Sequence, residues 1–410
     1  MRTLICLFVL LGAVQSPPAI AEPLTLGIIV HHADNIEAAS SVGFTAIRLW
    51  DSGTSWSDLA AQPDVYRFEP LEAMLQASEQ AHLRTVLVLG STPRWASARP
   101  NESCAYGFGC AAEPADMENW RRYVAQVTKT YRGRIECYEP WNEVSFPSDP
   151  IFLSSHDGGD PGQFFSGSID SLLSLVMIAY NEIKHNDPRA CVLSPSFHSS
   201  GNWIKKFDLF LGRGGGRYLD VVSQHFYFPE EPEQVIPVIR GMRELMAAHG
   251  LSNVPLWNTE VGISFATLAK IWPQLAIDEI VHAIMLRTYL LNMSENVSRV
   301  YWYAFGDGVL GFSDSLTQVD FGSAAASAVA HLLAGVQKVR CSNEGNLWQC
   351  RAIFRDHQIR ALWQEGKNVE PLWISLPAAA TRWGRVPATL PAASLIALDG
   401  RPVLIEEHSE

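Results

Sequence analysis

The chain has 410 residues, of which 47% are hydrophobic and 18% charged, and its formal net charge is −12. This composition indicates a globular protein long enough for one large domain and a small one. The acidic balance, with no compensating basic cluster, argues against nucleic-acid binding because phosphate backbones would be repelled. An acidic polysaccharide would meet the same long-range repulsion unless the binding cleft were locally basic.

The N-terminus has the pattern of a targeting segment. Arg2 precedes an apolar run over residues 4–14, and the small-residue site Ala19-Ile20-Ala21 stands before Glu22. This pattern predicts a secretory signal peptide over residues 1–21, cleaved after Ala21, and hence a secreted or periplasmic protein. No later stretch is apolar for long enough to cross a bilayer, so no membrane span is expected.

Short apolar runs then alternate with segments of helical periodicity. The eight runs cover residues 24–30, 45–50, 85–90, 135–141, 191–197, 219–227, 254–260 and 299–305. Apolar residues at helical spacing predict helices around residues 120–131, 172–183 and 273–293. Continuous apolar strands alternating with amphipathic helices predict a (β/α)8 TIM barrel over residues 22–333. A doubly wound open sheet is the alternative, but no Gly-rich phosphate loop follows the first run.

The last part of the chain changes period. After about residue 335 the runs alternate apolar and polar residues and lack helical spacing, which predicts strands over 347–354, 358–364, 369–376 and 393–400. We therefore expect a small all-β, sandwich-like domain over residues 334–410. The proline- and alanine-rich piece over residues 376–393 is expected to be a loop within it.

Six cysteines follow the expected signal peptide. Cys104 and Cys110, and Cys341 and Cys350, are close in sequence, and each pair predicts a small disulfide-closed loop, which suits an oxidising compartment. Neither pair has a partner pair at zinc-like spacing, so no metal is expected there. Cys137 and Cys191 lie in apolar runs, where buried thiols are the default expectation and a bridge between them is the alternative.

In a barrel of this kind, the chemistry lies at the C-terminal ends of the strands. The fourth run ends in Asn142-Glu143 and the seventh ends in Glu260, so the two carboxylates can converge from nearly opposite sides of the ring. Two carboxylates about 5 to 5.5 Å apart are what double-displacement glycoside hydrolysis requires. Neither the fold nor its packing requires a carboxylate at both positions.

These motifs carry a resemblance to a known family. A glutamate preceded by asparagine after strand four, with a second glutamate after strand seven, resembles the clan A retaining glycoside hydrolases. Within that clan, RLWDSGTSW, TPRWAS, EPWNEV and the C-terminal β domain look most like glycoside hydrolase family thirty-nine, particularly its bacterial exopolysaccharide-degrading members. The resemblance covers essentially the whole chain after the signal peptide.

The resemblance implies roles for three residues. Glu143 would be the acid/base, Glu260 the nucleophile, and Asn142 a hydrogen-bond partner of the sugar's 2-hydroxyl group. Desolvation beside Trp141 is expected to raise the pKa of Glu143. Glu260 must stay ionised, and the candidates for keeping it so lie at neighbouring strand ends: Arg48 and Tyr227.

Other strand-end residues have a functional and a structural interpretation. His225 either orients a carboxylate or a sugar hydroxyl, or is a satisfied core histidine, and Arg48 could be a salt bridge without a catalytic role. Trp302 and Trp95 are the tryptophans expected to form sugar platforms. Glu139 shares the strand parity of Glu143, and we expect it to have a structural hydrogen-bonding role.

The resulting hypothesis is a retaining O-glycoside hydrolase, without cofactor or metal and monomeric, that acts on an extracellular polysaccharide or oligosaccharide, with internal cleavage favoured. An exo-acting glycosidase and a catalytically impaired carbohydrate-binding protein are the alternatives. A metal-dependent barrel hydrolase is a third, but His31-His32 gives no H-x-H pattern. The insert over residues 146–167 is expected to form a loop over the cleft, where substrate identity would be determined.

Overall fold

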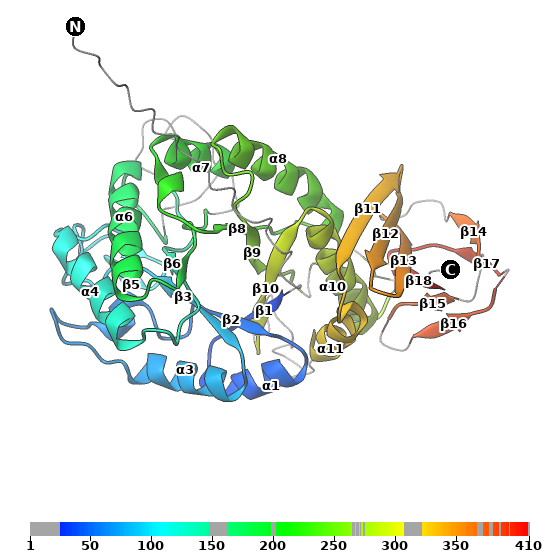
Figure 1. The fold of residues 1–410 in the computed structure, drawn as a ribbon, viewed down its shortest axis with the longest axis horizontal. Coiled ribbons are helices and arrows are strands. Elements are labelled where there is room, and N and C mark those ends of the chain that lie inside the picture. The colour runs from blue at the N-terminus through cyan, green and yellow to red at the C-terminus, as the bar shows by residue number, and fades with distance from the viewer. Residues whose placement is uncertain are drawn as a thin grey trace, which may run out of the picture.

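The computed structural model describes residues 25–146, 163–197, 202–264, 267, 270, 272–273, 275–306, 322–366, 372–376, 380–384, 387–392 and 394–408. The chain forms a ring of strands and helices followed by a group of antiparallel strands beside it (Figure 1). The expected signal peptide and most of the expected cleft loop lie outside the described residues. No helix among the described residues is long and apolar enough to cross a membrane.

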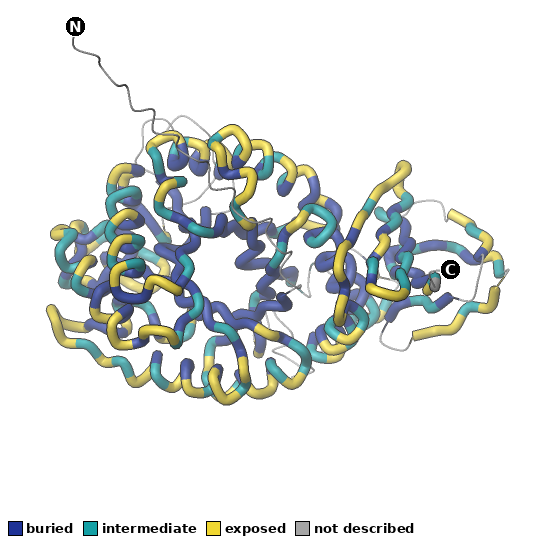
Figure 2. The backbone as a smooth tube through the Cα atoms, in the orientation of Figure 1, coloured by how far each residue is buried: buried dark blue, intermediate teal, exposed yellow. Residues whose placement is uncertain are grey.

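The ring is an eight-stranded parallel sheet with strand order β7-β6-β3-β2-β1-β10-β9-β8. A parallel bridge between Leu193 and Val221 joins the two outermost strands, which closes the ring seen in Figure 2. The strands are β1 (Thr25–Val30), β2 (Ala46–Leu49), β3 (Arg84–Leu89), β6 (Cys137–Pro140), β7 (Cys191–Val192), β8 (Val222–His225), β9 (Leu256–Val261) and β10 (Val297–Phe305). Each falls on one of the eight predicted runs, so the barrel prediction is confirmed.

Helices surround this sheet because its strands are apolar on both faces and must be covered on the outside. The helices are α1 (Ile36–Ser41), α2 (Trp56–Leu59), α3 (Glu69–Gln80), α4 (Met117–Thr130), α6 (Ile169–Asn186), α7 (Trp203–Gly212), α8 (Val235–Ala248), α10 (Ile277–Ser294) and α11 (Gly322–Leu333). The helices predicted around residues 120–131, 172–183 and 273–293 correspond to α4, α6 and α10. A two-stranded hairpin of β4 (Ser103–Cys104) and β5 (Gly107–Phe108) stands after β3.

The C-terminal part is built of antiparallel strands, as predicted. A six-stranded sheet has the order β11-β12-β13-β18-β15-β16, and β14 and β17 form a separate pair. A small apolar core that includes Leu362, Ile396 and Val403 lies between the two sheets. The strands are β11 (Lys338–Glu344), β12 (Leu347–Ile353), β13 (His357–Gln364), β14 (Trp373–Ser375), β15 (Ala380–Arg382), β16 (Ala388–Leu390), β17 (Leu395–Ala397) and β18 (Val403–His408).

One expectation for this region is wrong. The segment expected to be a loop, residues 376–393, contains β15 and β16, which pair with each other, and β15 also pairs with β18. Its Pro and Ala residues hide the strands because the alternating pattern there is short and weakly apolar. The boundary expected at residue 334 falls in the connection between α11 and β11, and the division into two domains remains a prediction.

Three disulfides join the cysteines. Cys104–Cys110 and Cys341–Cys350 form as predicted. Cys137 and Cys191 are bridged as well, so the default expectation of buried thiols is wrong. These residues face each other in register across β6 and β7, which brings their Cα atoms to 4.4 Å. Sequence alone does not show which strands of the ring are neighbours.

Candidate active site

Glu143 and Glu260 meet at the C-terminal end of the barrel, as predicted. Glu143 follows β6, and Glu260 lies in the last part of β9. One carboxylate oxygen of each residue and one ring nitrogen of His225 all lie within 4.8 Å of one another. This separation suits a carboxylate that attacks the reacting carbon directly, whereas inserting a water between the two would require about 6.5 to 9.5 Å.

The backbone that presents Glu143 has an unusual conformation. Trp141 has φ of 87° and Glu143 has φ of 45°, and both lie in the left-handed region that non-glycine residues rarely adopt. Two contacts hold this turn in place: the Trp141 indole donates to the carbonyl of Phe164 at 2.7 Å, and the Glu143 amide donates to the hydroxyl of Ser196. Such strain persists where the surrounding structure over-determines it, and it is common at functional sites.

Arg48 is the central cation of the site. Its guanidinium is completely buried and donates to the Glu260 carboxylate at 3.0 Å, to Glu139 at 2.7 Å and to the Asn142 side-chain oxygen at 2.6 Å. Burial alone would lower the pKa of Arg48, but the charges of Glu139 and Glu260 outweigh it and raise the pKa. Arg48 therefore remains a cation that binds three groups of the site at once.

Glu139 has the structural environment expected for it. It is completely buried, and its oxygens accept from Arg48 and from the Ser223 hydroxyl at 3.0 Å. These contacts occupy the carboxylate and orient Arg48 toward Glu260.

Glu260 receives the two contacts that the sequence suggested, from Arg48 and from the Tyr227 hydroxyl at 2.8 Å. Burial nevertheless raises the pKa of Glu260, and the charge of Glu143 adds to the rise, whereas His225, Arg48 and the Tyr227 hydrogen bond lower it. Burial, followed by the charge of Glu260, raises the pKa of Tyr227 well above its usual range, so its hydroxyl stays protonated and donates.

His225 connects the two carboxylates. Its side chain is fully buried, and its Nδ1 lies 3.1 Å from Glu143 and 3.8 Å from Glu260. A proton on Nδ1 would be donated to Glu143, whose oxygen is the nearer of the two. Arg48, Asn142, Glu143, His225, Tyr227 and Glu260 thus form one cluster.

The two tryptophans expected as sugar platforms have different surroundings: Trp302 pairs with Val261 beside Glu260, whereas Trp95 follows β3. Trp302 is only 4% exposed, and the next residue of β10, Tyr303, lines a cavity at the strand end. Trp95 lines a second cavity with Arg94 and Asn101, and its indole donates to the carbonyl of Ala60. Both platform assignments remain predictions.

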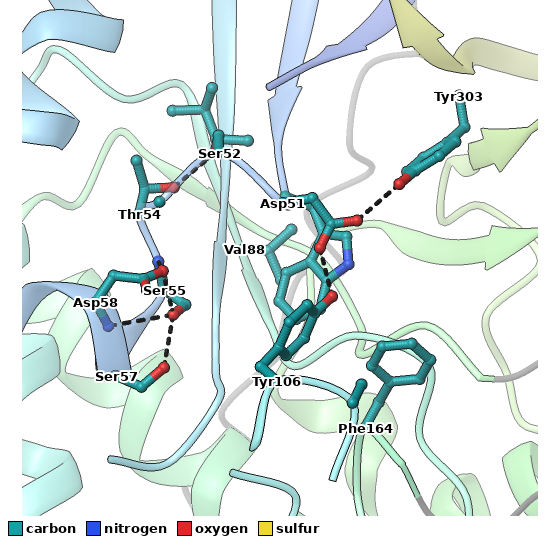
Figure 3. Close-up of a pocket in the computed structure, with 14 residues that line it drawn as sticks. Asp51, Ser52, Thr54, Ser55, Ser57, Asp58, Val88, Tyr106, Phe164 and Tyr303 are labelled. Atoms are coloured by element: carbon teal, nitrogen blue, oxygen red, sulfur yellow. Dashed lines mark hydrogen bonds between the residues drawn. The ribbon is translucent and has the colours of Figure 1, made fainter. Parts of the chain in front are cut away.

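The first of these cavities, of about 470 Å³, lies between the ends of β2, β3 and β10 (Figure 3). Asp51 stands in it, and its two oxygens accept hydrogen bonds from the hydroxyls of Tyr106 and Tyr303. Burial and then the charge of Asp51 raise the pKa of Tyr106. Tyr303 follows Trp302, which pairs with Val261 of β9, so this side of the cavity adjoins the strand that carries Glu260. These residues were not predicted to belong to the site, although Asp51 directly follows the run over 45–50, Tyr303 lies in the run over 299–305 and Tyr106 lies in CAYGFGC.

Among the described histidines, cysteines and acidic residues, one group lies close enough together to bind a divalent cation: Glu143, His225 and Glu260. The guanidinium of Arg48, at 3.0 Å from Glu260, already places a fixed positive charge there. Repulsion from that charge disfavours a metal ion at these carboxylates.

No protein-family model matches the sequence. No curated protein matches it either.

Solved structures share the fold. A family 39 glycoside hydrolase from the gut symbiont Bacteroides cellulosilyticus WH2 matches with a TM-score of 0.68 and 20% identity, over 94% of this chain and 81% of that one. A monomeric beta-xylosidase from Caulobacter crescentus CB15 matches with a TM-score of 0.63 and 17% identity, over 94% of this chain and 96% of that one. A GH30 endoxylanase from Clostridium papyrosolvens C71 matches with a TM-score of 0.59 and 12% identity, over 95% and 97% of the two chains.

At these identities the likeness concerns the fold. It extends over the barrel and the C-terminal strands together, so the predicted architecture of a TIM barrel followed by a small β domain is confirmed. The first structure belongs to the family that the sequence motifs resemble.

Proposed function

We propose that the protein is a retaining glycoside hydrolase that cleaves O-glycosidic bonds by double displacement. The observation that carries this proposal is the approach of Glu143 and Glu260 to within 4.8 Å, together with His225, at the ends of β6 and β9. The fold shared with structures described as glycoside hydrolases supports the same reaction class.

In the first step, a Glu260 oxygen attacks the anomeric carbon while Glu143 gives its proton to the departing glycosidic oxygen. In the second step, Glu143 takes a proton from water, and that water displaces Glu260 from the sugar. Arg48 and Tyr227 hold Glu260 by hydrogen bonds to its ionised form. Arg48 also donates to the Asn142 side-chain oxygen, which leaves the amide nitrogen of Asn142 as the group that would donate to a sugar 2-hydroxyl.

The substrate in this proposal is an extracellular polysaccharide or oligosaccharide, and the enzyme acts as a secreted or periplasmic monomer. The signal-peptide pattern over residues 1–21 and the three disulfides support export. The monomeric state follows the description of the Caulobacter beta-xylosidase.

Trapping of the covalent intermediate tests the proposal. The protein is exposed to activated 2-fluoro glycosides and short oligosaccharide versions of them, and intact mass and peptide mapping then locate the label. Label on Glu260 is the expected result, and label on another residue would contradict its assignment as nucleophile. Glu143→Ala should still accumulate the labelled intermediate from glycosides with good leaving groups, because its hydrolysis lacks a base.

A second test needs no inhibitor. Glu260→Ala should lose hydrolysis, and added azide should restore turnover to a glycosyl azide of inverted configuration. Retention of full activity by Glu260→Ala would overturn the proposed mechanism.

A further inference from the structure

The cavity around Asp51 contains a charged group that the proposed mechanism does not use. At about 470 Å³ the cavity falls within the range of small-molecule sites, about 300 to 1,000 Å³. Arg48 at the glutamate pair and Asp51 in the cavity are only three residues apart on the same chain segment. Tyr303 of the cavity also adjoins the strand that carries Glu260, because Trp302 of β10 pairs with Val261 of β9. A sugar held at the pair would therefore lie beside this cavity.

Asp51 is held so that its carboxylate remains available. Each of its two oxygens accepts one tyrosine hydroxyl, from Tyr106 and from Tyr303, and a carboxylate oxygen can accept a second hydrogen bond. Its backbone has φ of 56°, a conformation that asparagine and aspartate tolerate better than other non-glycine residues. The carboxylate thus faces the cavity with acceptor capacity left on both oxygens (Figure 3).

The cavity is acidic. Its described lining includes Asp51 and Asp58 and no lysine or arginine, and no ion pair to Asp51 occurs among the described residues. A sugar carboxylate placed here would meet a like charge, which disfavours its binding. Hydroxyl groups, in contrast, can donate to the free acceptor positions of Asp51.

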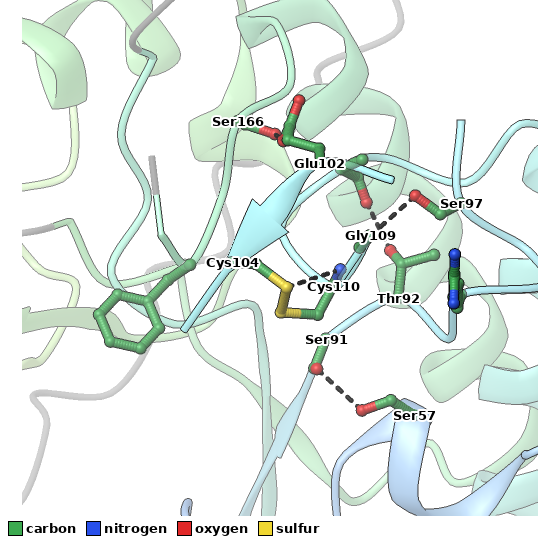
Figure 4. The surroundings of a disulfide bond; sticks show 12 residues. Ser57, Ser91, Thr92, Ser97, Glu102, Cys104, Gly109, Cys110 and Ser166 are labelled. Atoms are coloured by element: carbon green, nitrogen blue, oxygen red, sulfur yellow. Dashed lines mark hydrogen bonds between the residues drawn. A yellow bond between two sulfur atoms is a disulfide. The ribbon is translucent and has the colours of Figure 1, made fainter. Parts of the chain in front are cut away.

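The walls of the cavity suit a sugar ring. Trp50, Tyr106 and Phe164 form a cluster with ring centroids 5.7 to 6.3 Å apart, which gives the cavity an aromatic side. Tyr106 lies in the β4–β5 hairpin, which the Cys104–Cys110 disulfide closes (Figure 4). The hairpin is also tied to the segment before Phe164, because the Ala105 amide donates to the carbonyl of Gln163.

We propose that this cavity is a sugar-binding subsite beside the glutamate pair, and that Asp51, positioned by Tyr106 and Tyr303, selects sugars without a carboxylate by accepting their hydroxyl hydrogens. The inference rests on the proposed function and narrows its substrate class to polysaccharides with uncharged sugars at this subsite.

Binding measured separately from catalysis tests the inference. The full-length Glu260→Ala protein is applied to an array of oligosaccharides in which neutral glycans are matched with their uronic-acid counterparts. Calorimetry then measures the Kd of the neutral glycan that binds most tightly. It is measured for the Glu260→Ala protein and for three double variants, which add Asp51→Asn, Tyr303→Phe or Asp58→Asn. Asparagine suits the left-handed backbone at residue 51, and circular dichroism melting confirms that each variant is folded.

We expect neutral glycans to bind at least tenfold more tightly than their acidic counterparts. Asp51→Asn should raise the Kd of the neutral glycan tenfold or more and reduce the difference in Kd between neutral and acidic glycans. Tyr303→Phe should raise the Kd of the neutral glycan to a smaller degree. Asp58→Asn is the matched control, because it removes a charge from the same cavity while the Asp58 carboxylate bonds to Ser55; its Kd should stay within twofold.

Equal binding of acidic glycans, an Asp51→Asn Kd within twofold of its parent, or no glycan bound at all would overturn the inference. The proposed function fails by a different result. Glycans could bind in a way that depends on Asp51 while the unaltered protein neither cleaves them nor forms a covalent bond from Glu260 to fluoro sugars. That result would support the subsite and contradict the proposed hydrolase function.

Discussion

Single residues in this site act through their neighbours. Arg48 contacts Glu260 and Glu139 with different nitrogens, so the orientation of the proposed nucleophile depends on a carboxylate that itself lies away from the reaction. Taking two such charges out of water is costly, and their attraction repays the cost only when the hydrogen-bond geometry is good. The Ser223 hydroxyl, which donates to the other oxygen of Glu139, completes that geometry.

Tyr227→Phe should change the pH dependence of activity. The Tyr227 hydrogen bond lowers the pKa of Glu260, which burial holds above its ordinary value of 4.5, so losing the bond should raise that pKa further. Glu260 must be ionised to attack, and the acid limb of the kcat/KM profile should therefore move to higher pH. Tyr138→Phe is the control, because the buried Tyr138 hydroxyl has no partner among the described residues. An unmoved acid limb in Tyr227→Phe would contradict the assignment of that limb to Glu260.

Arg48→Met should destabilise the protein strongly. It leaves Glu139 buried without its cation, and breaking a buried pair in this way costs about 3 to 5 kcal/mol. Arg48→Met combined with Glu139→Gln removes the stranded charge and should recover a large part of the loss, as measured by urea unfolding. Equal destabilisation of the single and double variants would show that the Arg48–Glu139 pair is not coupled in stability.

The residues that sequence could predict are those whose position follows from the strand pattern. Glu143, Glu260, Arg48 and Tyr227 lie at or near ends of apolar runs, and the barrel brings such ends together. Tyr106 could not be found in this way, since it reaches Asp51 from a hairpin outside the barrel. The raised pKa of Glu260 was also missed, because its burial depends on side chains distant in sequence.

At the scale of elements, β6 is the strand on which the site depends. It carries Glu139, and the turn after it presents Glu143 in a left-handed conformation. The Cys137–Cys191 disulfide joins the start of β6 to the neighbouring β7, and the Glu143 amide contacts Ser196 beyond β7. Both ends of this strand pair are therefore fixed.

Removing the disulfide between β6 and β7 should cost more stability than removing the one in the β11–β12 hairpin. The two bridges close loops of 54 and 9 residues. Loop entropy then predicts that the free energy of unfolding falls by about 4 kcal/mol in Cys137→Ala/Cys191→Ala and by about 2.6 kcal/mol in Cys341→Ala/Cys350→Ala. Urea unfolding of both double variants checks the order, and a reversed order would show that native contacts outweigh loop entropy here.

Element prediction succeeded where burial produces a continuous apolar run, as in β1 and β3. It failed for β15 and β16, which have three residues each and are partly exposed. Their pairing comes from their place at one edge of the C-terminal sheet, a tertiary effect that a short sequence window does not contain.

In the whole molecule, α10 joins the barrel to the C-terminal sheet. All its residues from Ile280 to Asn292 are buried, which is typical of a helix covered on more than one side. The helix packs against both β10 and β11. The Trp383 indole donates to the carbonyl of His282, and the Trp363 indole donates to Glu233 in the short 3-10 helix Pro232–Gln234, within the loop region before α8. The C-terminal sheet thus stabilises a loop that begins at the candidate site.

Arg287 on α10 is the centre of this junction. It is completely buried, donates to Glu231 at 2.7 Å and pairs with Glu233, and its guanidinium lies over the rings of Trp272 and Trp363. Burial raises the pKa of Glu231, whereas the charge of Arg287 lowers it. The stability associated with this raised pKa is present at low pH and is lost as pH rises through the folded-state value.

Arg287→Met should therefore destabilise the protein by about 3 to 5 kcal/mol, because two carboxylates lose their buried cation. The deficit should shrink as pH falls, since protonation of Glu231, whose pKa burial raises, removes one of the unpaired charges. Urea unfolding at several pH values measures both effects, and kcat/KM for an activated glycoside should also fall because Glu231 is four residues beyond Tyr227. The control is Arg240→Met, which breaks an exposed pair with Glu295 and should cost no more than about 1 kcal/mol. A pH-independent deficit in Arg287→Met would mean that lost packing against the two tryptophans, and not the stranded carboxylates, couples the C-terminal sheet to the barrel.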